Sequence, residues 1–276
     1  MTAAERVLRT LTIAACGLLF FLPLWWVTVS AVRPQEEIFA FLSPLSPWTL
    51  WPRNVTLAHV VELWSGPFAR AIFNSMYVTV VTVVIGLVIS AKAGFALAVL
   101  PFRFREGVFV VIVVSFLIPF DAIALPLFGI MRGYGLQNTY TGLILPGIGN
   151  GLAVFLLRQF FLGIPRELRE AAMIDGMGWF GIFWRIYVPL SVPALISAGL
   201  ILFVFQWQAY LWPLIIAPAP DYKVAAVAIA QFSDFYGTNY SLIFAGSFFV
   251  SIIPMLVLVV FQRFFAASIA TSGSKD

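Results

Sequence analysis

The segment EAAMIDGMGWFGIFWRIYVPLSVPA, residues 170–194, is a charged and turn-rich stretch of an otherwise very apolar chain. Long windows elsewhere in the chain contain no charged residue. The charged residues between positions 157 and 186 are Arg158, Arg166, Glu167, Arg169, Glu170, Asp175 and Arg185. We therefore expect this segment to lie in water and to meet a soluble partner there.

The local pattern predicts a helix followed by a sharp turn. Pro165 can stand in the first turn of a helix, where a missing N–H costs nothing, and Glu167 suits the positive end of that helix. Gly176 predicts the end of the helix, with Asp175 placed to accept hydrogen bonds from backbone N–H groups of the turn. Ala171 and Ala172 are small enough to let another surface approach the backbone.

A second short helix is predicted after the turn, over residues 180–188. Its aromatic residues recur at three- and four-residue spacing: Phe180, Phe183, Trp184 and Tyr187. This spacing is typical of a helix that buries one face. The whole segment thus predicts a rigid projection, apolar enough to fit a groove of another protein. The alternative is an ordinary loop lying on the lipid headgroups.

Composition places the rest of the chain in a membrane. Hydrophobic residues make up 62% of the sequence and charged residues 10%, a balance that a soluble domain could not cover with a polar surface. The long apolar stretches lack the alternation of apolar and polar residues that is typical of a membrane barrel, so the fold class is expected to be all-α. We expect a single transmembrane domain over residues 1–276. Windows long enough to cross about 30 Å of hydrocarbon predict six spans, at 11–32, 71–100, 107–131, 140–162, 189–216 and 241–265.

The distribution of Lys and Arg predicts the orientation of these spans. With a cytoplasmic N-terminus, eleven of the sixteen basic residues lie at inside ends and loops, as the positive-inside rule requires. Both termini are then cytoplasmic. The basic residues form no run and no pattern interleaved with aromatics, so we expect them to set the membrane topology and not to bind nucleic acid. The five basic residues outside are Arg33, Arg53, Arg70, Arg132 and Lys223.

The only cysteine follows Ile13-Ala14-Ala15 and so resembles a lipoprotein cleavage box. Hydrophobicity continues unbroken to Val32, however, whereas a signal peptide should end near its cleavage site. We therefore expect Cys16 to be a small packing residue of the first span. One cysteine also excludes a disulfide within the chain and a multi-cysteine metal site, and no metal ligand set is expected.

A series of motifs carries a family resemblance. Glu170-Ala171-Ala172, then Asp175-Gly176, then Ile186-x-x-Pro189 resembles the EAA motif of permease subunits of bacterial ABC importers, with Val188 where that family usually has Leu. The resemblance covers about Leu22 to Phe265 and is strongest to the smaller permease of the maltose-type, carbohydrate-uptake branch. Other matching segments are Asn74-Ser75, residues 102–105, Ile118-Pro119, Pro126-Leu127, residues 135–140, 143–146, 155–161 and 164–168, and Trp207-x-x-Tyr210-Leu211-Trp212-Pro213-Leu214.

The resemblance implies a type I ABC importer permease of the bacterial inner membrane, with its coupling helix at about residues 163–188. Its implied partners are a second permease in a heterodimer, two ATPase subunits and an extracytoplasmic solute-binding lipoprotein. ATP and Mg would be held by the ATPase subunits, because this chain has no G-x-x-x-x-G-K-[ST] sequence, and the chain itself would not be an enzyme. The coupling residues implied are Glu170, Ala171, Ala172, Asp175, Gly176 and Pro189.

The third predicted span contains a carboxylate, Asp121, in the middle of its expected helix. Ionisable groups inside a membrane are costly and usually face a wet interior, which makes Asp121 a candidate for the solute pathway. The alternative is a cap for backbone groups that Pro119 and Pro126 leave unpaired.

The fifth predicted span contains a mixed polar and aromatic set: Gln206, Trp207, Gln208 and Tyr210. Amides that bind hydroxyls and rings that stack on sugar C–H faces suit a carbohydrate, although packing of the aromatics is the alternative. Gln208-Ala209 departs from the Asn-Asp or Asn-Glu common in the family, which leaves the identity of the solute open. Trp207-x-x-Tyr210-Leu211-Trp212 resembles glycerophosphodiester permeases slightly more, so glycerol-3-phosphate or a glycerophosphodiester is the alternative solute. An ion-coupled secondary transporter would need more buried titratable residues or a repeated half.

Overall fold

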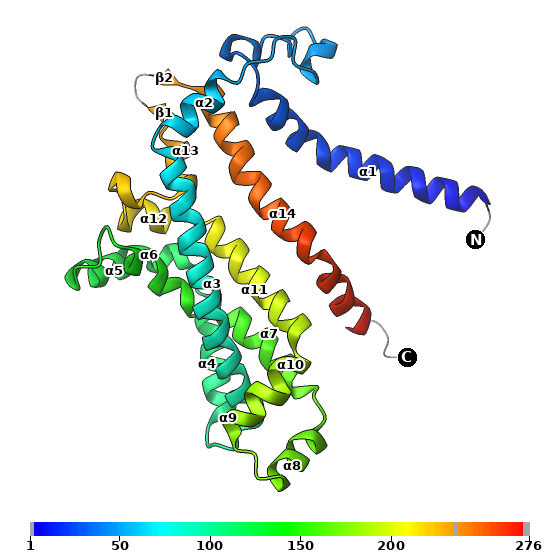
Figure 1. Cartoon of the computed structure of the whole chain (residues 1–276), viewed down its shortest axis with the longest axis vertical. Helices are drawn as coiled ribbons and strands as arrows, with labels where there is room; N and C mark the ends of the chain where they lie inside the picture. The colour runs from blue at the N-terminus through cyan, green and yellow to red at the C-terminus, as the bar shows by residue number, and fades with distance from the viewer. Residues whose placement is uncertain (1–2, 235–236, 273–276) are drawn as a thin grey trace. The chain divides into compact units, whose positions relative to one another are not determined.

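The computed structural model describes residues 3–234 and 237–272, and these residues are mostly helical (Figure 1). They form two compact units. The first unit comprises Met1–Ile72 and Ala225–Ile253, and the second comprises Phe73–Val224 and Pro254–Asp276. Helices α3 (Phe68–Val99) and α14 (Tyr240–Ser272) each contribute to both units.

The first unit has a small apolar core beside a long N-terminal helix. Its buried core residues are Ala31, Leu63, Phe68, Ala225, Leu242 and Ala245. The unit also contains a two-stranded antiparallel hairpin. Besides its parts of α3 and α14, the elements are α1 (Ala3–Ser30), 3-10 turns at Gln35–Glu37 and Pro47–Thr49, α2 (Ala58–Ser65), α13 (Ala225–Ala230), β1 (Ser233–Asp234) and β2 (Gly237–Thr238).

A buried cation organises the loop after α1. The Arg33 side chain is fully buried, and its Nη2 donates hydrogen bonds to the carbonyl oxygens of Trp48, Thr49 (3.0 Å) and Trp51 (2.9 Å). Burial lowers the pKa of Arg33 below its usual value, and the nearby carboxylate of Glu37 opposes that shift. The proline- and tryptophan-rich loop is therefore folded around a charged centre.

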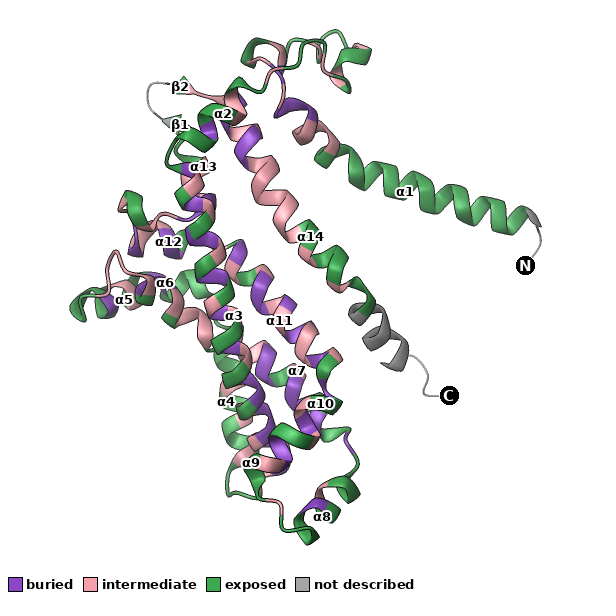
Figure 2. Cartoon of the chain, viewed as in Figure 1, coloured by how far each residue is buried: buried purple, intermediate pink, exposed green. Residues whose placement is uncertain are grey.

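Helix α1 is exposed over residues 4–24 (Figure 2). Cys16 is among these exposed residues, and its role as a small packing residue stays a prediction. An apolar helix with this much free surface is expected to be covered by lipid or by another chain.

The second unit holds the broken spans and the charged segment. Its main buried cluster joins α3, α7, α9 and α11 with the start of the charged segment. After α3 the elements are α4 (Arg105–Leu117), α5 (Phe120–Gly133), α6 (Tyr140–Ile144), a 3-10 turn (Leu145–Ile148), α7 (Gly151–Leu162), α8 (Arg166–Ile174), α9 (Trp179–Ile182), a π-helical turn (Phe183–Tyr187), α10 (Val188–Leu190), α11 (Val192–Trp207), α12 (Leu211–Ile216) and a 3-10 turn (Pro220–Tyr222).

Three helices in the described residues are long and apolar enough to cross a membrane, and three bent pairs bring the number to six if each pair is one span. The bends are 97° between α4 and α5, 41° between residues 140–148 and α7, and 83° between residues 179–190 and α11. The all-α prediction with up to six spans is confirmed. The predicted spans 107–131, 140–162 and 189–216 are not continuous helices, because they are interrupted at residues 118–119, 149–150 and 208–210.

Prolines explain two of these breaks, at residues 118–119 and 208–210. Pro119 biases the residue before it away from helical angles, and Ile118 is extended, with φ −72° and ψ 121°. Pro213 lacks an N–H and would clash with a carbonyl one turn earlier in a helix interior, so it fits only in the first turn of α12.

Close backbone contact holds α3 against α7. A Cβ atom at Gly94 would lie 3.1 Å from the backbone nitrogen of Arg158 and 3.2 Å from Cβ of Leu157. Small residues allow such approach between apolar helices, where dispersion contacts rather than water exclusion stabilise the pair. Helix α7 is therefore firmly seated on α3 at this level.

Candidate functional site

The turn after α8 has the hydrogen bonds of a Schellman motif. Gly176 has φ +79°, and its N–H donates to the carbonyl of Met173 at 3.0 Å. The N–H of Met177 donates to the carbonyl of Ala172 at 2.9 Å. These bonds pair carbonyls that the end of a helix leaves unsatisfied. The helix and sharp turn predicted from sequence are both present.

One face of α8 is anchored in the main core of the second unit. Ala172 is 6% exposed and belongs to the same buried cluster as Phe161 and Tyr187, with Met177 packed against it. Ala172 is therefore buried against this unit, and its role in coupling stays a prediction. Its methyl group points into the core because the Schellman turn folds Met177 back over it.

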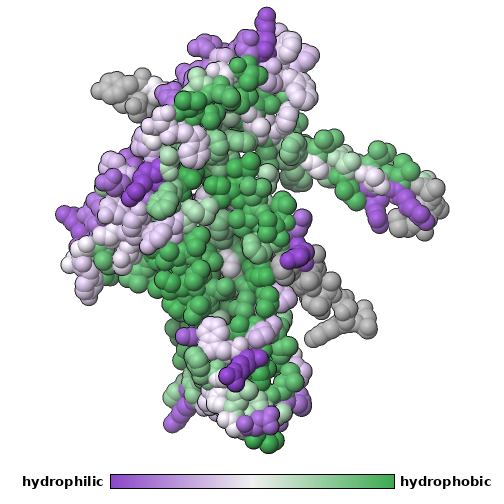
Figure 3. Space-filling model, viewed as in Figure 1, coloured by the Kyte–Doolittle hydropathy of each residue, from purple (hydrophilic) through white to green (hydrophobic). Residues whose placement is uncertain are grey.

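Apolar side chains of α8 and of the start of α9 are exposed on the outside of the unit. Ile174 is 86% exposed, and Leu168, Met173 and Phe180 are also exposed. Over the second unit, hydrophilic side chains gather at the end that α8 occupies, beyond a largely hydrophobic surface (Figure 3). We name Leu168, Met173, Ile174 and Phe180 the apolar tip. An exposed apolar patch with a polar rim is typical of a protein interaction site.

The aromatic stripe after the turn divides between core and surface. Phe183 and Tyr187 are buried in the core cluster, whereas Phe180 and Trp184 are exposed. The predicted burial of the stripe is thus correct for two of its four rings.

A π-helical turn at Phe183–Tyr187 was missed by the sequence reasoning. Pro189 offers the signal, since it has no N–H to donate to the carbonyl of Arg185. The N–H of Val188 bonds instead to the carbonyl of Phe183, five residues earlier. Pro189 itself is exposed, in α10. A wider turn of this kind often marks a functional position in a helix.

The charged residues of the segment are at the surface. Glu170 accepts a hydrogen bond from Arg169 Nη2 at 3.3 Å, an exposed pair that contributes little stability. Ala171 is exposed beside it. The side chain of Asp175 makes no hydrogen bond to any residue in the described part of the chain, so its predicted bonds to the turn are not formed. The turn is held by backbone bonds alone.

The second candidate region lies where broken spans meet. On one side of the breaks the rings of Phe116 and Phe205 are 6.2 Å apart, and on the other side those of Phe120 and Trp212 are 5.8 Å apart. The α4–α5 and α11–α12 breaks are therefore at the same level. Irregular backbone at membrane depth is tolerated where protein or a water-filled cavity surrounds it.

The bend before α7 belongs to this region too. A Cβ atom at Gly147 would lie 2.5 Å from Gln206 Oε1. The carboxamide of Gln206, at the end of α11, is therefore in contact with the backbone just before the bend. Three broken spans of the second unit thus come together near one level.

The predicted pathway residues differ in exposure. Asp121 is exposed in the first turn of α5, not in the middle of a helix, and within residues 3–234 and 237–272 it forms no cap hydrogen bond or ion pair. Gln208 and Tyr210 are exposed in the break after α11, not within a helix, and Gln206 is half-buried. Trp207 is buried and its ring stacks on that of Phe203, with the ring centres 5.7 Å apart, so packing explains Trp207 better than contact with solute.

A further crevice in the second unit does not suit a polar solute. A crevice of about 270 Å³ between α3, α11 and α14 is lined by apolar side chains, including Leu87, Leu195 and Phe203. It has no donors or acceptors for hydroxyl groups. In the part of the chain that the structure describes, no three His, Cys, Asp or Glu residues are grouped as metal ligands would be.

The family profile described as "Binding-protein-dependent transport system inner membrane component" matches residues 83–271, more than half of the chain. This chain belongs to that family. The permease is thus a multi-pass transport component of the inner membrane, as the motif series predicted.

Relatives support the same assignment over nearly the whole chain. The arabinooligosaccharides transport system permease protein AraQ of Halalkalibacterium halodurans is 34% identical over 271 residues, which cover 97% of this chain and 96% of AraQ. The sn-glycerol-3-phosphate transport system permease protein UgpE of Agrobacterium fabrum is 31% identical over 265 residues, which cover 94% of each chain.

A solved structure shows the fold. A chain in the crystal structure of a bacterial ABC transporter involved in the import of the acidic polysaccharide alginate matches with a TM-score of 0.79 and 21% identity, covering 96% of the permease and 99% of that chain. The permease therefore has the type I ABC importer permease fold and is a subunit of an ABC importer.

The turn at Gly176 can be tested on the permease alone. Gly176→Val should destabilise the end of α8, because a β-branched residue at φ +79° is strained by roughly 1–3 kcal/mol. Gly178→Val is the matched control, since Gly178 has φ −74° and open space around its Cβ position. Hydrogen exchange should become faster at residues 172–177 in the first variant only. Equal exchange in both variants would contradict a required left-handed residue.

Proposed function

We propose that this permease imports a neutral carbohydrate and takes its energy from ATPase subunits that bind the apolar tip. The observation that carries the proposal is the two-faced α8: Ile174 is 86% exposed, while Ala172 is 6% exposed and belongs to the core shared by α3, α7 and α11. Force applied at the tip would move these helices together, because a packed core is nearly incompressible.

Each of the predicted coupling residues then has a physical part. Glu170, Ala171 and Asp175 form the polar and small-residue rim around the apolar tip. Gly176 supplies the left-handed turn, and Pro189 sets the π-helical turn where the segment returns to the membrane. Ala172 acts as the anchor and not as a contact.

The proposed complex contains a second permease subunit in a heterodimer, two ATPase subunits that hold ATP and Mg, and an extracytoplasmic solute-binding lipoprotein. ATP-driven closure of the ATPase pair would displace the apolar tip and tilt the helices between inward-open and outward-open arrangements. The description of the family as binding-protein-dependent supports the lipoprotein in this set.

The solute class follows from the polar groups beside the breaks. Gln206, Gln208 and Tyr210 supply amide and hydroxyl groups, and Asp121 supplies a carboxylate. None of these is a cation, so the region favours a polyhydroxylated neutral solute over glycerol-3-phosphate or another anion. An arabino-oligosaccharide, which AraQ is named for transporting, is the first solute to test.

Docking at the apolar tip predicts a sharp effect of one surface charge. Ile174→Lys should leave folding intact, because the side chain is 86% exposed. It should lower co-purification of the ATPase subunits about tenfold or more, since a charge at a desolvated contact costs on the order of 2 kcal/mol. Leu45→Lys is the control, with a side chain 79% exposed in the loop after α1. Unchanged co-purification in the Ile174 variant would rule out this docking site.

The orientation of the permease can be tested with single cysteines. In a Cys16→Ala background, Gly178→Cys should react with a membrane-impermeant maleimide only from the cytoplasm, and Ser233→Cys only from outside, because the basic residues favour cytoplasmic termini. Both positions are exposed. Reaction of both from the same side would show that the spans have been miscounted.

The solute pathway can be tested in proteoliposomes that contain the whole complex, with arabinotriose and sn-glycerol-3-phosphate as probes. Gln208→Ala and Asp121→Asn should each lower arabinotriose uptake by roughly 3–10-fold, as expected for a lost hydrogen bond. ATPase assembly should stay unchanged. Ser115→Ala is the control, because its hydroxyl bonds only to the backbone of its own helix, at 2.7 Å. Wild-type uptake in both variants would assign recognition to the second permease.

A further inference from the structure

A buried arginine links three helices of the second unit. The Arg158 side chain, on α7, is 8% exposed, and its Nη2 lies 2.8 Å from both Oε1 and Oε2 of Glu106 in the first turn of α4. The guanidinium carbon also lies 4.0 Å from the centre of the Phe109 ring. Such a charge-assisted bond combined with a cation–π contact is directional as well as strong.

The same arginine closes the end of α3. Its Nε donates to the carbonyl oxygen of Leu97 at 3.3 Å. Because α3 ends at Val99, this carbonyl is one of the last four that no N–H of the helix can reach. A cation is favourable at that helix end, and Glu106 is favourable at the N-terminus of α4. One side chain therefore fixes the α3–α4 turn to α7.

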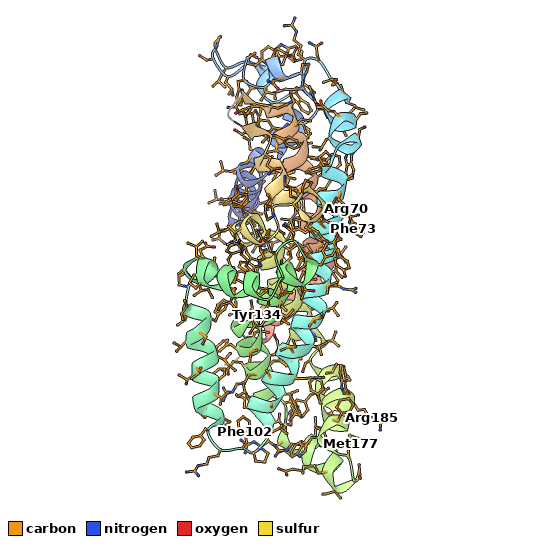
Figure 4. The ribbon with its side chains drawn as sticks, turned by 90° about the vertical axis from the view of Figure 1, so that its left-hand side faces the viewer. Arg70, Phe73, Phe102, Tyr134, Met177 and Arg185 are labelled. Atoms are coloured by element: carbon orange, nitrogen blue, oxygen red, sulfur yellow. The ribbon has the colours of Figure 1, made fainter. Side chains whose placement is uncertain are left out.

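Helix α7 also borders the anchor of α8. Leu157 and Phe161 of α7 are in the core cluster that contains Ala172 of α8. Figure 4 places Met177 and Arg185, of the segment that follows α8, at the same end of the unit as Phe102 in the α3–α4 turn. Helix α7 therefore lies between α8, on its core side, and α4, on its Arg158 side.

We propose that the Arg158–Glu106 pair is a positioning joint that transmits movement of α8 through α7 to α4. Helix α4 leads directly to the break at residues 118–119, so the joint ties this break to the coupling segment. The inference rests on the proposed transport function.

A charged pair suits a joint better than it suits stability. Burying the arginine costs desolvation energy, and well-packed apolar residues would hold three helices at least as firmly. Arg158 Nη2 bonds both carboxylate oxygens of Glu106, and this charged contact joins α4 to α7 at one defined position. The ion pair thus selects one arrangement in which the helices move as a body.

The test measures whether ATP changes the α4–α5 break. In a Cys16→Ala background, the reporter is Leu117→Cys, at a side chain that is 70% exposed beside the break. The complex with its ATPase and partner subunits is labelled with maleimide, with and without ATP and vanadate. We expect the labelling rate of the parent to change about fivefold or more, the lower range of typical coupling between sites.

Glu106→Ala should abolish that change while ATPase assembly and ATP hydrolysis persist, because the Glu106 side chain is 62% exposed, so water can take the place of its carboxylate beside Arg158. Arg158→Lys should weaken the change, since a single ammonium can meet Glu106 but cannot also reach the Leu97 carbonyl that Arg158 Nε bonds. Arg105→Ala removes the second cation at Glu106, whose Oε1 lies 3.4 Å from Arg105 Nε, but keeps the Arg158 bond, so it should leave the change intact. Glu106→Asp should restore much of the change.

Three results would overturn or redirect the inference. A full ATP-dependent change in Glu106→Ala and Arg158→Lys would show that the pair transmits nothing. Equal losses of assembly, ATP hydrolysis and labelling change in both variants would show a purely structural role. An unchanged labelling rate in the parent complex would instead contradict the proposed ATP-driven function itself.

Discussion

The structure depends on one constraint, that backbone N–H and C=O groups at membrane depth must find partners inside the protein or in a wet cavity. Continuous helices such as α1 satisfy it by themselves. The breaks at residues 118–119 and 208–210 do not, and the structure brings them to one level beside polar side chains such as Gln208. Gathering the breaks therefore gives the unit one polar region within an apolar body.

The same constraint decides how much the sequence could predict. The length of each apolar stretch indicates whether it can cross a membrane, so the number of spans was predictable from local composition. The turn after α8 was predictable from Gly176. The length of an apolar stretch does not show whether its helix changes direction, so the 97° bend between α4 and α5 was missed although Pro119 marks it. Asp121 was accordingly placed in mid-helix when it lies in a first turn.

Contacts between distant residues were beyond the sequence reasoning. Ala172 reads as a small surface residue until the Schellman turn places its methyl group in the core. Arg158 reads from the sequence as one of the charged residues expected in water, but its side chain is buried against Glu106, which lies 52 residues away. Nothing in local spacing pairs these two side chains. Such positions are decided by packing, and a single sequence carries little signal for them.

Apolar and charged contacts respond differently when one helix is displaced against another. The core around Phe161 and Ala172 resists compression but sets no unique register, because dispersion contacts are individually weak and not directional. The guanidinium of Arg158 sets register, at a desolvation cost that packing alone would not require. A static protein gains nothing from that cost. In a permease that must transmit a displacement from α8 to the break at residues 118–119, the same bond makes α7 and α4 move together. A buried charge at this position is therefore physically reasonable.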